Sequence, residues 1–398
     1  MSAPGRAARC ARFVSAGARV GAIASAVAAC IGADAATGAP APPPTVIVSG
    51  PPSAGDISPF VASSADGSVL AYAARDGNRY VVEHLDSGST TRLQLQTGYS
   101  GDVAPALTRD GRILIYGRRF PKPTRDRLVI VDMATGRRPV IRGYASPGPR
   151  ISATGRYITT HRAHGDDEGI LDLRTGRFTP FAPAPHGSSD AGAFALSADG
   201  LWAVYGHSAH GVTQCFLFSR VTRSGRLLGD CSEHVAISAD GERVLFSGGL
   251  AGQSSELVLP SGQIAPSDEL FERSTGTRTR VPGSGSKAGA PGPTLTDDGT
   301  TLAFACEDGN TYLYSLATRT YAEVATGVAG EPTVVALAPS GSAVFVAGAV
   351  TDAKTGRAGF RFVRESTADA RPLGTGYPAG CTTAAAQPAA RARRPPPG

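Results

Sequence analysis

Six of the seven histidines lie in one stretch of the chain and are accompanied by acidic residues. They form two His-x-x-His pairs and two single residues: His161, His164, His207, His210, His186 and His234. Asp166, Asp167 and Glu168 follow the first pair. Neutral imidazoles coordinate transition metals, and imidazoles also titrate between about pH 5 and pH 8. These residues therefore make up a candidate ligand-binding set.

Two interpretations of this set remain open, because the surrounding sequence carries no motif that decides between them. In the first, the histidines line a polar pocket for a ligand or a metal ion whose identity the sequence leaves unknown. In the second, they lie on solvated surface loops. The chain has no His-Glu-x-x-His, no Cys-x-x-Cys and no Gly-x-Ser-x-Gly motif. We therefore predict no catalytic residue and no cofactor.

An internal repeat indicates which elements position the histidines. Seven short segments of the type Ser-x-Asp-Gly align on a glycine: Gly67, Gly111, Gly155, Gly200, Gly241, Gly299 and Gly341. These glycines are 44, 44, 45, 41, 58 and 42 residues apart. A period of about 40 to 45 residues corresponds to one four-stranded propeller blade. The sequence predicts an all-β, seven-bladed β-propeller over residues 45–380.

Each repeat has the internal order of four strands, A to D. Asp-Gly favours the A–B hairpin, since Gly accepts positive φ, and later Thr-Gly pairs mark the C–D hairpins. The interval of 58 residues is assigned to a long B–C loop over 247–267, ahead of a strand at 268–273. Thr45 to Val48 is predicted to pair with the last blade and to close the ring. Aromatic residues recurring on the second strand are predicted to fill the blade interfaces: Tyr72, Tyr116, Tyr157, Tyr205 and Phe246.

This order sorts the histidines by face. The B–C and D–A connections emerge on one face of a propeller, and the A–B and C–D turns on the other. Both His-x-x-His pairs fall in predicted B–C loops of blades three and four, while His186 and His234 fall in predicted D–A links. The candidate binding residues are thus expected on the B–C loop face.

The Ser-x-Asp-Gly, strand, loop, strand, Asp-x-x-Thr-Gly pattern resembles TolB-type, WD-repeat-like propellers of bacterial envelopes. The resemblance covers nearly all of residues 45–376. It departs from true WD repeats, because the chain has a single Trp202 and no Trp-Asp pair. The shared motif is structural, so the resemblance implies a binding scaffold and does not name a ligand.

Four cysteines remain after the predicted leader. Cys215 opens a strand of blade four and Cys231 follows the next strand, so folding about the turn between them brings the two nearly opposite. Cys306 is then left to Cys381. Four cysteines permit three connectivities, and this one is the prediction.

The two ends of the chain are predicted to lie outside the propeller. Residues 1–35, with four arginines ahead of an apolar core, are typical of a signal peptide. Cleavage before Cys30, as in a lipobox with Cys30 as lipid anchor, and cleavage after Ala35 both fit. Residues 36–44 are a Pro-rich linker, and residues 381–398 are expected to form a disordered basic tail.

The distribution of charge along the chain limits the kinds of molecule that the protein is expected to bind. The formal net charge is +6, but the leader and tail carry it, and residues 36–390 are neutral. A neutral body lacks the cations that nucleic-acid binding needs. We expect an exported monomer that binds an envelope or extracellular protein, peptide or glycan without catalysis, and that meets the membrane only through a lipid anchor. The alternative is a propeller enzyme, a lyase or hydrolase, using a His/acid or metal site on the same face.

Overall fold

The computed structural model describes residues 45–50, 57–74, 79–94, 104–118, 127–145, 148–162, 167–182, 189–209, 212–248, 255–258, 264–283, 294–306, 310–326, 328, 334–351, 358–378 and 381. All of them belong to one compact unit, Pro43–Gly398. The predicted signal peptide, Cys30, the linker and residues 382–398 lie outside the described residues. Within the described part, no helix is long and apolar enough to cross a membrane.

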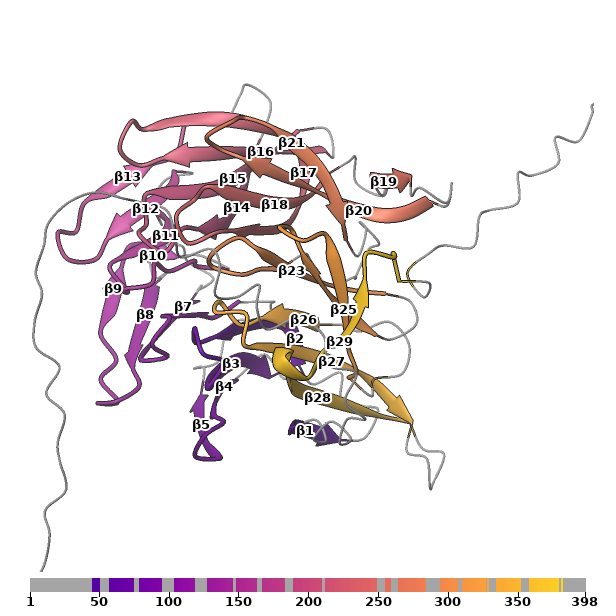
Figure 1. Ribbon diagram of the computed structural model, residues 1–398. Helices are drawn as coiled ribbons and strands as arrows, with labels where there is room; N and C mark the ends of the chain where they lie inside the picture. The colour runs from indigo at the N-terminus through magenta and orange to yellow at the C-terminus, as the bar shows by residue number, and fades with distance from the viewer. Residues whose placement is uncertain are drawn as a thin grey trace, which may run out of the picture. The chain divides into compact units, whose positions relative to one another are not determined.

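The fold is all-β, a seven-bladed propeller of four-stranded antiparallel blades, as predicted. The blades follow one another along the chain in the colour order of Figure 1. Blades one to three contain these strands: β2 (Ile57–Ser63), β3 (Val69–Ala74), β4 (Arg79–His84) and β5 (Ser89–Gln94); β6 (Ala106–Leu107), β7 (Ile113–Arg118), β8 (Arg127–Asp132) and β9 (Val140–Arg142); β10 (Tyr144–Ala145), β11 (Tyr157–Arg162), β12 (Glu168–Asp172) and β13 (Phe178–Pro180).

Blades four and five share one long strand, β17 (Ser224–Ile237), and blades five and six each carry one additional strand, β19 (Ser255–Val258) and β29 (Arg371–Gly374). Blades four to seven contain these strands: β14 (Ser189–Leu196), β15 (Trp202–Ala209), β16 (Val212–Ser219) and β17 (Ser224–Ile237); β18 (Arg243–Gly248), β19 (Ser255–Val258), β20 (Ile264–Glu272) and β21 (Arg278–Pro282); β22 (Thr294–Leu295), β23 (Thr301–Ala305), β24 (Thr311–Ser315) and β25 (Thr320–Val324); β26 (Val334–Leu337), β27 (Ala343–Thr351) and β28 (Ala358–Ser366), completed by β1 (Thr45–Gly50). A short 3₁₀ turn (Thr367–Asp369) and β29 (Arg371–Gly374) follow β28.

Two predictions about blades four and five are wrong in detail. β17 runs without interruption from strand D of blade four into strand A of blade five, so the predicted D–A link holding His234 is a strand. The long B–C connection of blade five contains β19, which pairs with the first half of β20. Strand C of that blade therefore begins at Ile264 rather than at Asp268. Register shifts within β17, between Cys231 and Val235, bend the shared strand between the two sheets.

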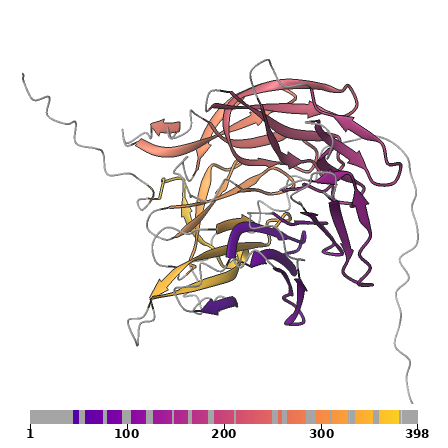
Figure 2. The same ribbon diagram turned by 180° about the vertical axis from the view of Figure 1, so that it is seen from behind.

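The N-terminal strand completes the last blade, which confirms the predicted ring closure. β1 pairs antiparallel with β28, and the two lie side by side in both views (Figures 1 and 2). β29 adds a fifth strand to blade six by pairing with β25. The N- and C-terminal segments of the propeller are thus each hydrogen-bonded to a blade.

The recurrent Ser/Thr-x-Asp-Gly motif builds the A–B turns of blades one, two, four, five and six in the same way. In blade one the Ser64 hydroxyl donates to Asp66 at 2.7 Å and accepts from the Val69 N–H at 2.9 Å. The hydrogen bond from Ser64 lowers the pKa of the Asp66 carboxyl. Gly67 follows with φ 70°, a conformation that side chains with a Cβ disfavour. This geometry explains why the motif recurs in the sequence.

The A–B turns also join the blades to one another through backbone hydrogen bonds. In blades one and three to six, the N–H of the second motif residue donates to the carbonyl of its counterpart in the next blade, as from Ala198 to Ala239 at 2.9 Å. Between blades seven and one, Pro339 has no N–H, and Ser340 donates to Ala65 instead. The seam between the last and first blades is therefore built like the other interfaces.

Two charged side chains also link distant A–B turns. Arg109 of blade two forms an ion pair with Asp297 of blade six. Blades two and six are not neighbours, so this pair reaches across the ring axis on the turn face. Burial lowers the pKa of Arg109 to about 10, which leaves the guanidinium charged at neutral pH.

The predicted interface aromatics are buried, and both predicted cysteine pairs are disulfides. One aromatic, Tyr157, lies two residues after its turn glycine, and Thr160 holds the position five residues after it that Tyr72, Tyr116, Tyr205 and Phe246 hold in other blades. The Cα atoms are 5.8 Å apart in Cys215–Cys231 and 4.9 Å apart in Cys306–Cys381. Cys381 is therefore a buried part of the propeller, and disulfides of this kind are typical of oxidising compartments.

Candidate functional site on the B–C loop face

One strand-C residue in each blade occupies an equivalent, buried place toward the B–C loop face. This residue pairs with the strand-B residue that comes six positions after the glycine of the A–B turn, as Tyr80 pairs with Ala73, six residues after Gly67. We call it the C-strand position. Its occupants, from blade one to blade seven, are Tyr80, Leu128, Glu168, Cys215, Asp268, Thr311 and Phe362. Blades seven, one and two thus carry large apolar residues there. Blades three to six carry two carboxyls, a disulfide and a hydroxyl.

Glu168, a predicted binding residue, occupies the C-strand position of blade three and is only 8% exposed. Its register partner is His161, another predicted residue. One carboxylate oxygen, Oε1, accepts a hydrogen bond from the backbone N–H of Ala193 in blade four at 2.8 Å. Register shifts on both sides of Ala193 interrupt the β14 ladder at this point. Glu168 therefore connects blades three and four at the loop face.

The exposed part of the predicted set lies beside Glu168. Asp167 and Arg162 face solvent and approach to 4.0 Å, and the Arg162 guanidinium lies 4.6 Å from the centre of the Phe178 ring. His161 ends the same hairpin and is half-buried. Blade three therefore presents a cation, an anion and an imidazole at one loop end.

His207 lies in β15 and not in a loop, which corrects the sequence interpretation. Its side chain is 4% exposed and packs edge-on against Tyr205 and Phe216, with ring centres 5.2 and 5.4 Å apart. Neither the pocket nor the solvated-loop interpretation describes such an environment. His207 belongs to the aromatic core of blade four.

The other predicted residues are placed less fully. His164, His186, His210 and Asp166 lie outside the described residues, and nothing is described of the His234 side chain. Among the residues that the structure describes, no three His, Cys, Asp or Glu side chains converge as metal ligands would. Of the predicted set, the structure brings together His161, Asp167 and Glu168.

Asp268, which the sequence interpretation did not select, has the most unusual environment. It is fully buried in β20, and its Oδ1 accepts a hydrogen bond from the Ser247 hydroxyl at 2.8 Å. Its Oδ2 has no hydrogen-bond partner among the described residues and packs against Gly283, where any Cβ would overlap it. Burial raises the pKa of Asp268 to about 7.

Two neighbouring polar groups share this lack of partners. Within the part of the chain that the structure describes, the Ser267 hydroxyl is buried and unpaired, and so is the hydroxyl of Tyr377, a residue that packs between blades five and six. The only sequence signal for these polar groups was Asp268 itself, an acidic residue at the start of a predicted strand. The sequence could not show that Ser267 and Asp268, in the half of β20 nearest the B–C loop face, are buried.

Comparisons with known proteins bear on the fold alone. No protein-family model and no curated protein matches the chain. A solved Myceliophteria thermophila Cps50 (Swd1) β-propeller domain is similar at a TM-score of 0.50 and 13% identity, covering 76% of this chain and 95% of that one. A Kuenenia stuttgartiensis hydrazine synthase structure has a TM-score of 0.48 and 14% identity, covering 77% and 96%. The first supports the propeller architecture, and the TolB-type assignment stays a prediction.

Proposed function

We propose that this propeller is a non-enzymatic binding module that holds a protein, peptide or glycan partner on its B–C loop face over blades three to five. The observation that carries the proposal is the contrast at the C-strand position. Blades three and five place carboxyls where blades seven, one and two place large apolar residues. Buried acids reduce stability unless they are paired, and they concentrate at functional sites.

The chemistry at the surface suits a polar partner. Arg162, Asp167 and His161 offer a donor, an acceptor and a titratable ring within one hairpin end, and Glu168 fixes that hairpin to blade four. Peptides and glycans present both donors and acceptors to such a surface. The Arg109–Asp297 pair crosses the axis on the opposite face.

The setting that we propose is the cell envelope, as the resemblance to TolB-type propellers implies. Two disulfides support an oxidising environment. The predicted leader supports export, with or without a lipid at Cys30. The partner would then be an envelope or extracellular molecule.

The enzymatic alternative has one observation in its favour. A carboxyl with a pKa near 7, such as Asp268, has the value that general acid–base catalysis requires. Asp268 is fully buried, however, and its free oxygen packs against Gly283, which leaves no room for a substrate. The binding role therefore accounts better for the geometry.

The test is capture of envelope components by the purified protein, followed by titration of the partner that is found. The variant combines Arg162→Ala and Asp167→Ala, both of which face solvent and leave Glu168 in place. We expect affinity for the captured partner to fall about tenfold or more, as for truncated interface contacts. The matched control is Arg92→Ala in β5, an exposed arginine of blade one.

Unchanged affinity of the double variant would remove the loop face of blade three from the proposal. A loss shared equally by Arg92→Ala would indicate general charge attraction. Turnover of the captured molecule, abolished by Asp268→Asn, would favour the enzyme instead.

A further inference from the structure

The face formed by the A–B and C–D turns, the turn face, is neutral overall, but its arginines and its acids lie mostly over different blades. The A–B and C–D turns lie on one face, and a backbone hydrogen bond joins them in each blade, as from Met133 to Arg112 at 2.8 Å. In blades two to four, these turns (108–113, 132–138, 152–157, 172–177, 197–202 and 219–223) hold nine arginines and four aspartates. The turns of the other four blades (64–69, 84–89, 238–243, 272–277, 296–301, 315–320, 338–343 and 366–370) hold three arginines and eight acids.

Several arginines of blades two to four are unneutralised. Arg137, Arg138, Arg174, Arg177 and Arg223 are exposed, and none has an ion pair among the described residues. The acids beside them are already engaged. Asp172 binds Arg156 at 2.7 Å, and Asp132 lies 3.5 Å from Arg112. We call this part of the turn face, over blades two to four, the basic sector.

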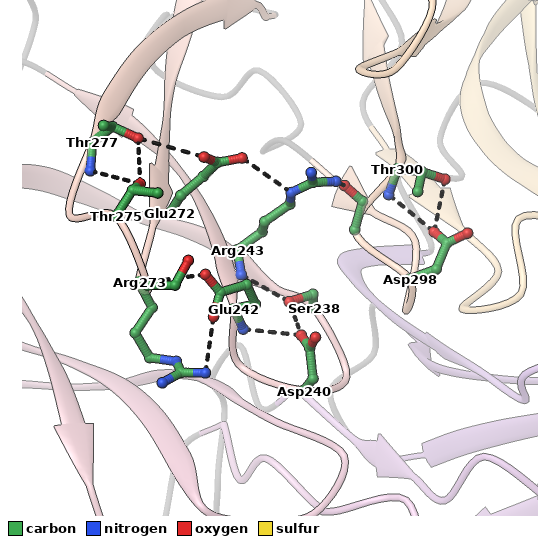
Figure 3. A network of polar contacts seen from close by, with 12 residues as sticks. Ser238, Asp240, Glu242, Arg243, Glu272, Arg273, Thr275, Thr277, Asp298 and Thr300 are labelled. Atoms are coloured by element: carbon green, nitrogen blue, oxygen red, sulfur yellow. Dashed lines mark hydrogen bonds and ion pairs between the residues drawn. The ribbon is translucent and has the colours of Figure 1, made fainter. Parts of the chain in front are cut away.

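Blade five shows the contrasting arrangement (Figure 3). There Glu242 binds Arg273 at 2.8 Å, and Glu272 lies 3.5 Å from Arg243. Arg243 also donates to the carbonyl of Gly299 in blade six at 2.7 Å. The arginines of blade five are thus used to hold blades together, whereas the exposed arginines of the basic sector face solvent.

An aliphatic side chain projects from the same sector. Val221, at the C–D turn of blade four, is 72% exposed; among the described residues, Val140 and Leu227 are the other exposed large hydrophobic residues, and both are less exposed. Leu227 lies on the same hairpin. Arg223, beside Val221, has φ 55° at the place where Gly136, Gly176 and Gly276 stand in blades two, three and five. Arginine adopts this left-handed conformation less readily than glycine.

We propose that the basic sector docks on an anionic phospholipid bilayer, with Val221 entering the interfacial region. Arginines spread over several turns match the distributed phosphates of such a surface, and each adds to the attraction. An exposed aliphatic tip between arginines gains free energy in a lipid interface, and it gains none beside a soluble polyanion. The neutral body predicted from the sequence thus has one face suited to direct membrane contact.

The experiment is co-sedimentation of the purified protein with vesicles of phosphatidylcholine alone or with 30% phosphatidylglycerol, about 0.1 M salt being the reference. We expect binding to the anionic vesicles only, weakened by added salt. Arg174→Gln with Arg223→Gln should weaken the partition coefficient roughly 30-fold, from the attraction per arginine. The matched control is Arg92→Gln with Arg142→Gln, two exposed arginines on outer strands, which should change it less than threefold.

Val221→Ser separates a lipid surface from other polyanions. It should reduce binding to anionic vesicles severalfold and leave binding to a soluble polyuronate or to duplex DNA unchanged. Equal loss with both arginine pairs, or no binding to anionic vesicles at low salt, would overturn the proposal. Tighter binding to polyuronate or DNA than to vesicles, insensitive to Val221→Ser, would also overturn it and assign the sector to that polymer.

Discussion

Two halves of the ring solve the same packing problem differently. Blades seven, one and two fill the C-strand position with Phe362, Tyr80 and Leu128, all fully buried. Blades three to six place Glu168, Cys215, Asp268 and Thr311 there. Both disulfides also lie in this second half, one between blade four and the first strand of blade five and the other between blade six and the C-terminal segment.

The contrast shows which part of a repeated blade stays constant and which part varies. The turn motif is nearly constant around the ring, since every blade needs the same hairpin and the same link to its neighbour. The loop-face half of strand C has no such duty and can vary. In blades three to six the variation introduces polar groups that weaken the core, and covalent bridges offset that loss.

The largest expected effect comes from moving an acid into the apolar half. Leu128→Asp would place a carboxylate among the apolar side chains of Ile115, Ile158 and Leu171. We expect the free energy of unfolding to fall by about 5 kcal/mol, measured by urea denaturation. Glu168→Gln, at the equivalent place, keeps an acceptor for Ala193 and should lose only about 1 kcal/mol. Similar losses in both variants would mean that the halves do not differ.

The second effect concerns the bridges of the polar half. Cys306→Ser with Cys381→Ser opens a sequence separation of 75 residues, and should lower the free energy of unfolding by about 4.5 kcal/mol. Cys215→Ser with Cys231→Ser opens a separation of 16 residues, and should cost about 3 kcal/mol. The two variants serve as controls for each other in the same denaturant series. A larger loss for the short bridge would contradict the chain-entropy explanation.

The third effect is pH-dependent stability through Asp268. Its pKa is about 7 in the folded chain, against 3.8 for a solvated aspartate, so the native protein binds the extra proton between these values. Stability from this group is complete below about pH 4 and is lost as the pH rises toward 7. Asp268→Asn should therefore stabilise the protein by about 4 kcal/mol at pH 8 and by well under 1 kcal/mol at pH 4.

Thermal unfolding of both proteins across this range provides the measurement. Glu365, whose pKa burial also raises to about 7, is unchanged in the variant and leaves a common slope in both curves. A gain that is equal at pH 4 and pH 8 would show that the effect comes from packing and not from the proton.

The sequence alone was sufficient for the features that depend on local geometry and repetition. Gly at positive φ, Asp beside it and a period of about 40 to 45 residues predicted the hairpins and the seven blades. Folding about one turn predicted Cys215–Cys231, elimination left Cys306 to Cys381, and the need to close the ring predicted that Thr45 to Val48 completes blade seven; the structure confirms all three. Short-range determinants explain the success with the hairpins, since a turn or a hairpin partner is specified within a few residues. The ring closure and Cys306–Cys381 join distant residues, and they were predicted because stacked blades must form a closed ring and because one cysteine pair remained.

The candidate site was predictable only in part. His161, Asp167 and Glu168 were selected correctly as neighbours, because they belong to one hairpin. His207 was placed in a loop, although β15 extends through it and Tyr205 and Phe216 cover its ring. Asp268 was not selected at all. A period of two along a strand states which side chains share a face, but not what the next blade places against that face.

The tertiary structure decided the rest, since burial in a propeller arises between blades whose residues lie about 40 positions apart or more. Only the packed ring sets Glu168 against the N–H of Ala193, and only it leaves Asp268 sealed behind Gly283. It likewise brings Arg109 to Asp297 across the axis. It also pairs arginines of blade five with acids, while several exposed arginines of blades two to four have no ion pair among the described residues. Composition and net charge are sums over the chain. Pairing and exposure depend on position, which the fold supplies.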